Sequence, residues 1–450
     1  MKILITSDLN TYSVNGVITS INNLMYGLRA RGHEVKLLTL SPNHETRVTE
    51  DGWEVASLPA GIVYPGVRVR VGLMNKVYDK VIDWNPDIIH SQCEMSTFVM
   101  AHHIAHECDV PIVHTYHTVY EDYTHYVVKG HLFPEQQNKM ARQAVAEFSK
   151  IISTLCGAMI APTEKVKEML EGYDCKCPLH VIPTGIDLTR FSQQLSASER
   201  VEMRGKYGFT DDDIVAVYLG RVAAEKNIDE VIEYISKAPK NVKLLVTGGG
   251  PKLEDLEKLV NKKGYDSRVS FVGMVDPSDV WKYYKLGDFF TSASTSETQG
   301  LTYIEALSSG LPLLCRKDQC LDGVVIDKVN GCMFENEQEF NAGIETIINI
   351  ISDEAYNRDD IAKTAEKFSR ECFAASCESL YLDTIKTYSR KSISETAKEN
   401  IQAALNRLTE LSRRHIEYVK EPINKLKTNL NEIFEEFEIT NNSSDDSKNN

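Results

Sequence analysis

The sequence has no long hydrophobic run. No stretch approaches the roughly 18 uncharged apolar residues that a membrane-spanning helix needs. A secretory signal pattern is also missing at the start, because the polar Thr6-Ser7-Asp8 directly follows the short apolar segment Ile3-Leu4-Ile5. We therefore expect a cytoplasmic protein without a membrane-spanning helix.

Cysteine spacings typical of zinc ribbons and redox motifs are missing too. Among the ten cysteines the closest pair is Cys175 and Cys177, a CxC arrangement that fits neither class. Cys156 and Cys315 stand in apolar runs, where free cysteine packs as a small hydrophobic residue. We expect all ten to be reduced thiols, as is usual in the cytoplasm.

An excess of positive charge is lacking as well. The formal net charge is −15 over 450 residues. Because broad nucleic-acid binding requires a basic field, we expect no nucleic-acid partner. A local basic patch that touches an anionic surface is still compatible with this composition.

What the sequence does contain is a regular alternation of apolar strands and amphipathic helices. Strands predicted at 2–6 and 34–38 flank a helix over 18–31, which makes a βαβ unit with a parallel sheet. The other strands predicted in the N-terminal half are 88–90, 112–114 and 159–161. A second series after Phe191 has predicted strands at 214–218, 242–246, 269–272, 289–290 and 311–315. Two such series predict two doubly wound domains that face each other across a cleft.

The predicted fold class is therefore α/β, with two Rossmann-like domains and a C-terminal helical extension. The predicted segments are an N-terminal domain over 1–190, a C-terminal domain over 191–365, a return helix towards the N-terminal domain over 366–392, a helical extension over 393–440 and a disordered tail over 441–450. An apolar stripe in the extension allows packing on the protein's own body, self-association or lipid contact. Its mixed charges favour the first two.

The most informative stretch runs from Ser294 to Leu307 and joins a predicted strand to a predicted helix. It places Glu297 in the loop and Glu305 on the helix, at the edge where α/β sheets bind ligands. Gly300 allows the backbone to approach a phosphate closely, and a helix N-terminus favours an anion. On their own, two glutamates at this spacing more often belong to a solvated helix face than to a binding site. The other motifs of the sequence therefore decide between these two interpretations.

Several motifs occur together and in order. The E-x7-E pair is preceded by Gly220-Arg221 with Lys226 five positions after the arginine, by Pro183-Thr184-Gly185-Ile186-Asp187, and by the glycine turn Thr247–Gly250. This set resembles the retaining GT-B glycosyltransferases of family 4, and the resemblance covers about residues 1–390. The resemblance implies a metal-independent enzyme without a cofactor that moves a hexose from a nucleotide sugar with retention. No DxD element stands at a plausible donor strand end, since Asp211-Asp212-Asp213 precedes a strand and fits a solvated turn.

The resemblance also implies the residues that bind the donor. Arg221 and Lys226 would hold the donor diphosphate, where two cations stabilise a leaving group that gathers negative charge. Glu297 would orient the hexose hydroxyls, and Glu305 would accept hydrogen bonds from the ribose hydroxyls. The remaining donor-binding residues would be Gly16, Gln299, Gly300 and Leu301.

Two further residues carry roles through the resemblance. Gly16 belongs to the loop after the first strand, which is glycine-rich in the family and here keeps one glycine where a pair is common. His117, just after the predicted strand 112–114, would point towards the sugar and the acceptor, and would complete the catalytic set of His117, Arg221, Lys226 and Glu297. His114 falls within the strand, and we expect a structural role for it.

Finer features favour one branch of the family. The run 114–126 is dense in histidines and aromatic residues, and together with Asp87–Gln92 and Gln299 it looks like the bacterial diacylglycerol α-glucosyltransferases. That likeness implies UDP-glucose as the donor and 1,2-diacylglycerol as the acceptor. Another donor (UDP-galactose, GDP-mannose), another acceptor (ceramide, a glycolipid, a cell-wall glycan) and a non-catalytic scaffold that binds UDP-sugars stay open as alternatives.

A lipid acceptor requires contact with a membrane surface. Arg68 and Arg70 alternate with apolar residues, and Tyr126 and Lys129 belong to a second segment of the same kind. Such segments can dock on anionic lipid, which we favour over the alternative of an exposed strand and a cleft-lining loop. The expected partners are thus a nucleotide sugar, a lipid acceptor, the inner face of an anionic membrane and a second copy of the chain through its C-terminal helices.

Overall fold

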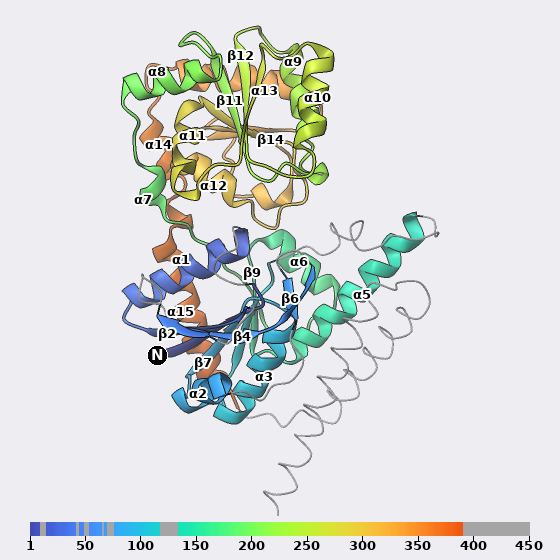
Figure 1. Cartoon of the computed structure of the whole chain (residues 1–450), viewed down its shortest axis with the longest axis vertical. Helices are drawn as coiled ribbons and strands as arrows, with labels where there is room; N and C mark the ends of the chain where they lie inside the picture. Colours follow the sequence, from blue (N-terminus) through green and yellow to red (C-terminus); the bar gives the residue numbers. More distant parts are fainter. Residues whose placement is uncertain are drawn as a thin grey trace, which may run out of the picture. The chain divides into compact units, whose positions relative to one another are not determined.

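The computed structural model describes residues 1–9, 15–41, 45–48, 54–64, 67–69, 76–117 and 134–389, in some places as backbone alone. The chain forms two compact units, one from Met1 to Pro183 together with the chain from Ala374 onward, and one from Thr184 to Phe373 (Figure 1). Within the described parts no helix is both long and apolar enough to cross a membrane. The predicted extension over 393–440 and the predicted tail over 441–450 lie outside the described residues.

The first unit is built on an eight-stranded sheet with the order β10-β9-β8-β7-β1-β2-β4-β3. Its strands are β1 (Lys2–Ser7), β2 (Glu34–Ser41), β3 (Glu45–Val48), β4 (Glu54–Pro59), β7 (Ile88–Ser91), β8 (Ile112–Thr115), β9 (Ala158–Ala161) and β10 (Leu179–Val181). All neighbours pair in parallel except β3, which runs antiparallel to β4 at the edge. A separate antiparallel hairpin consists of β5 (Gly61–Tyr64) and β6 (Val67–Val69).

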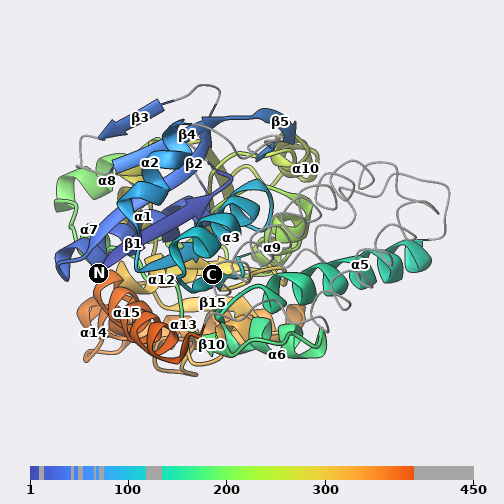
Figure 2. The ribbon, with the colours of Figure 1, turned by 90° about the horizontal axis from the view of Figure 1, so that it is seen from below.

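Helices cover both faces of this sheet. They are α1 (Gly16–Ala30), α2 (Lys76–Trp84), α3 (Ser96–Cys108), α5 (Pro134–Thr154), α6 (Glu164–Gly172) and α15 (Arg370–Thr387). Neighbouring strand residues point to opposite faces. Ile89 accordingly packs in the core beneath α2 and α3, whereas the Nδ1 atom of His90 lies 2.6 Å from the hydroxyl of Tyr381 on α15. Figure 2 shows α15 and α2 on opposite sides of this sheet.

A second set of contacts, made by Glu378, also holds helix α15 to the first unit. Glu378 forms ion pairs with Arg31, at the end of α1, and with the Nε2 atom of His33, which lies 2.8 Å away. The final helix of the described chain, which lies within the predicted return segment, therefore belongs to the N-terminal unit over most of its length.

The second unit has a six-stranded parallel sheet with the order β13-β12-β11-β14-β15-β16. The strands are β11 (Ile214–Leu219), β12 (Val242–Thr247), β13 (Val269–Gly273), β14 (Phe289–Ser292), β15 (Leu313–Arg316) and β16 (Gly331–Phe334). The α-helices are α7 (Leu188–Phe191), α8 (Ala197–Lys206), α9 (Ile228–Lys237), α10 (Leu253–Lys263), α11 (Val280–Leu286), α12 (Leu301–Ser308), α13 (Glu337–Ser352) and α14 (Arg358–Lys363). The 3-10 turns are η2 (Ala224–Lys226), η3 (Pro277–Asp279), η4 (Gln319–Leu321) and η5 (Glu366–Phe368).

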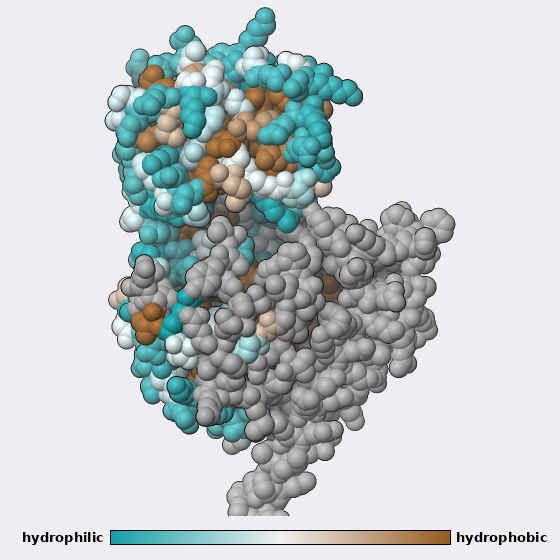
Figure 3. Space-filling view, in the orientation of Figure 1, coloured by the Kyte–Doolittle hydropathy of each residue, from teal (hydrophilic) through white to brown (hydrophobic). Residues whose placement is uncertain are grey.

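The core of this unit lies on both faces of its sheet. Val215 and Val217 of β11 pack in one buried cluster, and the alternating Ala216 and Tyr218 pack in the other. On the face seen in Figure 3, hydrophilic residues of this unit are interspersed with groups of hydrophobic residues. The prediction of two Rossmann-like α/β domains is confirmed.

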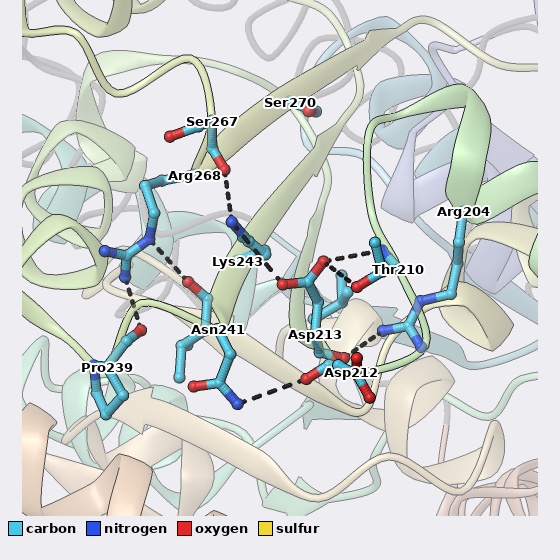
Figure 4. A network of polar contacts seen from close by, with 12 residues as sticks. Arg204, Thr210, Asp212, Asp213, Pro239, Asn241, Lys243, Ser267, Arg268 and Ser270 are labelled. Atoms are coloured by element: carbon cyan, nitrogen blue, oxygen red, sulfur yellow. Dashed lines mark hydrogen bonds and ion pairs between the residues drawn. The ribbon is translucent and has the colours of Figure 1, made fainter.

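A polar network fixes the amino ends of β11, β12 and β13 (Figure 4). Lys243 donates to the carbonyl of Ser267 over 2.7 Å, and its Nζ atom lies 3.8 Å from the carboxylate of Asp213. Asp213 also accepts a hydrogen bond from the backbone N–H of Thr210 over 2.8 Å. The aspartates at 211–213 therefore form a turn at the end of the sheet opposite to the carboxyl ends of its strands.

Candidate functional site

In the second unit the candidate residues gather at the carboxyl edge of the sheet, where β11 and β14 end side by side. These strands pair in parallel, so the loops that follow them emerge at the same edge. The loop after β11 leads through η2 into α9, and the loop after β14 leads into α12. Asn227 links the two, because its side-chain amide donates to the carbonyl of Ala293 over 3.1 Å.

An ion pair between Lys226 and Glu297 joins these two loops. The Nζ atom lies 2.6 Å from Oε1 of the glutamate and 3.5 Å from the hydroxyl of Ser294. The side chains are 12% and 22% exposed, so both remain accessible to a small molecule. The structure thus places two of the predicted donor residues in direct contact.

Arg221 also has an acidic partner, Glu225, four residues further along the chain. The guanidinium is half exposed, whereas the glutamate is buried. The hydroxyl of Tyr218 donates to the backbone carbonyl of Arg221 over 3.0 Å, and burial together with the charges of Glu297 and Glu225 raises the pKa of this tyrosine. Each predicted diphosphate-binding cation therefore has a carboxylate partner.

The glycine turn after β12 packs tightly against the loop that carries Arg221. Gly248 and Gly250 have φ angles of +130° and +154°. A Cβ atom on Gly248 would lie 1.9 Å from the carbonyl oxygen of Gly220, and one on Gly250 would lie 2.3 Å from that of Val222. Only glycine fits this close backbone approach, which explains the glycine run in physical terms.

Helix α12 carries the second predicted carboxylate. It begins at Leu301, after Gly300 in the left-handed conformation with φ +73°. Glu305 accepts a hydrogen bond from the hydroxyl of the buried Tyr284 over 2.7 Å. Burial raises the pKa of Glu305 from 4.5 to about 7, against the lowering effect of the Tyr284 hydrogen bond.

The structure gives Gln299 a contact that the sequence does not reveal. Its side chain accepts from the backbone N–H of Thr184 over 2.7 Å and donates to the carbonyl of the same residue over 2.9 Å. Gln299 is buried, and it fastens the loop after β14 to Thr184, the first residue of the second unit. The loop that carries Glu297 and the interdomain motif that contains Thr184 are therefore in direct contact, although they are far apart in the sequence. Donor binding by Gln299 stays a prediction.

Replacing Gln299 with leucine should lower the free energy of unfolding by about 2–4 kcal/mol. The substitution leaves both backbone groups of Thr184 buried without these partners. Denaturant unfolding followed by circular dichroism measures the change. The same substitution at the exposed Gln194 is the control; equal stability of the two variants would show that the Thr184 contact contributes nothing.

The first unit has its own polar edge, at the carboxyl ends of β1, β7 and β8. Asp8 follows β1 and accepts hydrogen bonds from the backbone N–H groups of Thr97 and Met95, over 2.8 and 3.1 Å, at the start of α3. Burial raises the pKa of Asp8 to about 7. Glu94 is buried nearby, and its Oε1 atom lies 3.4 Å from Nε2 of His114.

His117 lies at the same edge, directly after β8. Its Nε2 atom lies 2.6 Å from Oε1 of Gln92, which follows β7. Burial lowers the pKa of His117 to about 4, with His114 acting in the same direction and Glu94 against it. The imidazole is therefore neutral at neutral pH.

Sequence reasoning missed Asp8 and Glu94. A usable signal existed, because both acidic residues stand in loops that follow predicted parallel strands, Asp8 two residues after the strand 2–6 and Glu94 four residues after the strand 88–90. Gly16 stands at the first position of α1, behind Asn15, whose side chain accepts from the backbone N–H of Ile18.

The structure does not describe the side chains of the four residues that we predict to contact the acceptor and the membrane. Arg68 lies in β6, which is described as backbone, and Arg70, Tyr126 and Lys129 lie outside the described residues.

Two family models match the chain. The model for Glycosyltransferase Family 4 matches residues 14–190, and the model for glycosyl transferases group 1 matches residues 199–368. Each match covers one of the two α/β series of the sequence.

Two curated relatives are similar over most of the chain. The alpha-monoglucosyldiacylglycerol synthase of Streptococcus pneumoniae is 34% identical, with 86% of this chain and 86% of the relative covered. The protein of the same name from Acholeplasma laidlawii is 32% identical, with 87% and 99% covered.

Solved structures share the fold. Sucrose-phosphate synthase from Thermosynechococcus elongatus matches with a TM-score of 0.65 and 18% identity, covering 86% of this chain and 100% of that one. Anabaena HepE, solved in complex with UDP-glucose, matches with a TM-score of 0.62 and 17% identity over 86% of this chain and 100% of its own.

Proposed function

The chain belongs to the GT-B glycosyltransferases of family 4, and we propose that it transfers glucose from UDP-glucose to the hydroxyl of 1,2-diacylglycerol. Two observations support the proposal. The first is the similarity to two alpha-monoglucosyldiacylglycerol synthases at 34% and 32% identity over most of the chain. The second is the cluster of Arg221, Lys226, Glu297 and Glu305 at one sheet edge, which is the observation that carries the donor assignment.

Each member of this cluster has a task that its chemistry suits. Lys226 and Arg221 meet the diphosphate, because charge-assisted hydrogen bonds to phosphate oxygens are strong. Glu305 on α12 accepts hydrogen bonds from the two ribose hydroxyls. Glu297 orients the hexose hydroxyls while its neighbour Lys226 holds the phosphate, so the pair acts at the junction of sugar and leaving group.

The proposed reaction proceeds with retention and without a metal ion. The bond from the anomeric carbon to the diphosphate breaks, and the acceptor oxygen bonds to that carbon on the same face. The proton of the acceptor hydroxyl passes to the departing phosphate oxygen, so no base from the protein is required. The negative charge that develops on the diphosphate is stabilised by Arg221 and Lys226.

UDP binding should tighten as the pH rises through about 7, because Glu305 has to be ionised to accept two ribose hydrogen bonds. Its folded pKa is raised, so the carboxyl contributes stability at low pH that is lost as the pH rises through about 7. Relative to Glu305→Gln, the wild type should thus bind UDP better but unfold more easily at high pH. Calorimetry and denaturant unfolding across the range of about pH 5 to 8 measure both.

Comparison of wild type with the glutamine variant cancels the titration of UDP itself. Identical pH dependence of UDP binding in the two proteins would remove Glu305 from the ribose site.

Membrane contact through Arg68, Arg70, Tyr126 and Lys129 is part of the proposal, since a lipid acceptor has to be reached at a bilayer surface. Arg68→Glu with Arg70→Glu should weaken binding to anionic vesicles several-fold and leave UDP binding unchanged. Vesicle sedimentation measures it. The variant with Lys258→Glu and Lys262→Glu, two exposed lysines of α10, has the same change in net charge. Unchanged binding in the arginine variant would locate the docking surface elsewhere, and equal loss in both variants would show an effect of net charge alone.

The proposed reaction is tested by product analysis. UDP-glucose, UDP-galactose and GDP-mannose are each offered with diacylglycerol, ceramide and soluble acceptors, and the products are identified by mass spectrometry. Formation of glucosyl diacylglycerol supports the proposal. Transfer from another donor or to another acceptor would replace that part of it, and UDP binding without any transfer would indicate a scaffold.

A further inference from the structure

The side chain of Gln92 makes its hydrogen bond to His117. Among the described residues this is its only hydrogen bond, because the side-chain nitrogen of Gln92 is buried and has no partner there. The backbone N–H of Gln92 donates a separate hydrogen bond to the carbonyl of Thr6. Since β7 and β8 pair in parallel, with Ser91 opposite His114, Gln92 and His117 both stand in loops that leave neighbouring strands at the same edge of the sheet.

The contact determines which nitrogen of the histidine carries hydrogen. The amide oxygen of Gln92 can only accept, so the Nε2 atom of His117, 2.6 Å away, has to donate. A neutral imidazole has one N–H, which leaves Nδ1 with a lone pair. In this state Nδ1 can accept a hydrogen bond from a hydroxyl group.

We propose that Gln92 is a positioning residue that holds His117 as the Nε2–H tautomer, so that Nδ1 accepts a hydrogen bond from a substrate hydroxyl. The inference deepens the proposed function and rests on it for the hydroxyl, which belongs either to the hexose or to the acceptor. The tautomer itself follows from the contact between the two side chains.

An amide suits this task better than a carboxylate would. The titratable groups that face His117 in the described structure are Glu94, His114 and His90. His90 has both nitrogens engaged, Nδ1 by Tyr381 of α15 and Nε2 by Thr115 of β8. A negative charge at position 92 would favour the imidazolium, which has no lone pair and cannot accept. Glutamine fixes the ring and adds no charge.

The first test is spectroscopic and does not depend on activity. In full-length protein with 15N-labelled histidine, long-range proton–nitrogen correlation should show Nδ1 of His117 as the unprotonated nitrogen and Nε2 as the protonated one. The signals of His117 are identified by their loss in His117→Gln. A protonated Nδ1 would overturn the proposal, because it would mean that the amide of Gln92 donates to the ring.

The second test is the pH profile of kcat/KM. Gln92→Glu keeps the hydrogen bond from Nε2 but raises the pKa of His117, so the acidic limb should move up by about 1–2 pH units, with near-normal activity above it. Gln92→Leu removes the hydrogen bond and should lower kcat about tenfold at every pH. Gln194→Glu, the same change at an exposed position, should leave the profile as in the wild type.

The two substitutions separate positioning from mere packing. Loss of activity in Gln92→Glu without a displaced limb would overturn the proposal. The KM values assign the hydroxyl: in Gln92→Leu a raised KM for UDP-glucose indicates the hexose, and a raised KM for diacylglycerol indicates the acceptor. If NMR shows Nε2 of His117 protonated but no nucleotide sugar is turned over, the proposed tautomer is confirmed and the proposed function is wrong.

Discussion

Replacing Lys226 with alanine should lower kcat by about a hundredfold to a thousandfold, the usual cost of removing one preorganised group that stabilises developing charge. The Nζ atom lies at the junction of two loops, 2.6 Å from Glu297 and accessible to a ligand. Without it, the charge on the leaving diphosphate faces Glu297 with no cation between them. Steady-state kinetics with UDP-glucose measure the effect, and Lys258→Ala on the exposed face of α10 should be silent.

A double substitution separates two explanations of that loss. If Lys226 acts on the leaving group, Lys226→Ala combined with Glu297→Gln stays as slow as the single variant or slower. If the alanine variant fails only because Glu297 is left unpaired, the additional Glu297→Gln should restore activity. Recovery in the double variant, or near-normal turnover in Lys226→Ala, would contradict the assignment of the diphosphate site.

Replacing Gly300 with alanine should destabilise the second unit by about 2–5 kcal/mol and abolish donor binding. The left-handed backbone costs about 1–2 kcal/mol for a residue with a Cβ atom, and overpacking adds about 1–3 kcal/mol. That Cβ atom would lie 2.3 Å from Cε2 of Tyr303, a buried ring in the core. Relief requires a shift of α12, which carries Glu305. Denaturant unfolding and UDP titration measure the two effects.

Gly264 provides a matched control. Its φ angle of +71° is close to the +73° of Gly300, but a Cβ atom there would meet nothing within 4 Å. Gly264→Ala should therefore show the backbone cost alone and bind UDP normally. Equal destabilisation by the two substitutions would mean that the contact with Tyr303 is relieved without disturbing α12.

Much of the fold could be predicted from the sequence, because central strands of a parallel sheet are buried on both faces and appear as short apolar runs. The segments Lys2–Ser7 and Ile214–Leu219 are of this kind. Edge strands lack this signature, and Glu45–Val48 went unpredicted for that reason. Pro312 explains why the strand predicted from Leu311 begins at Leu313.

For the candidate site, sequence reasoning supplied the residue types but not their partners. Arg221, Lys226, Glu297 and Glu305 stand in motifs with a fixed spacing. The hydrogen bonds of Gln299 to Thr184 and of His117 to Gln92 join positions 115 and 25 residues apart, and no local pattern encodes such pairs. They follow from which strands are neighbours in the sheets, which the sequence alone did not determine.

The central claim is tested most directly by the glycolipid formed from UDP-glucose and 1,2-diacylglycerol with the purified full-length chain. Isolation of the product and NMR of its anomeric centre should show glucose attached to the diacylglycerol hydroxyl in the α configuration. A β-linked product would contradict retention. Transfer to soluble acceptors with no glucolipid formed would contradict the lipid acceptor.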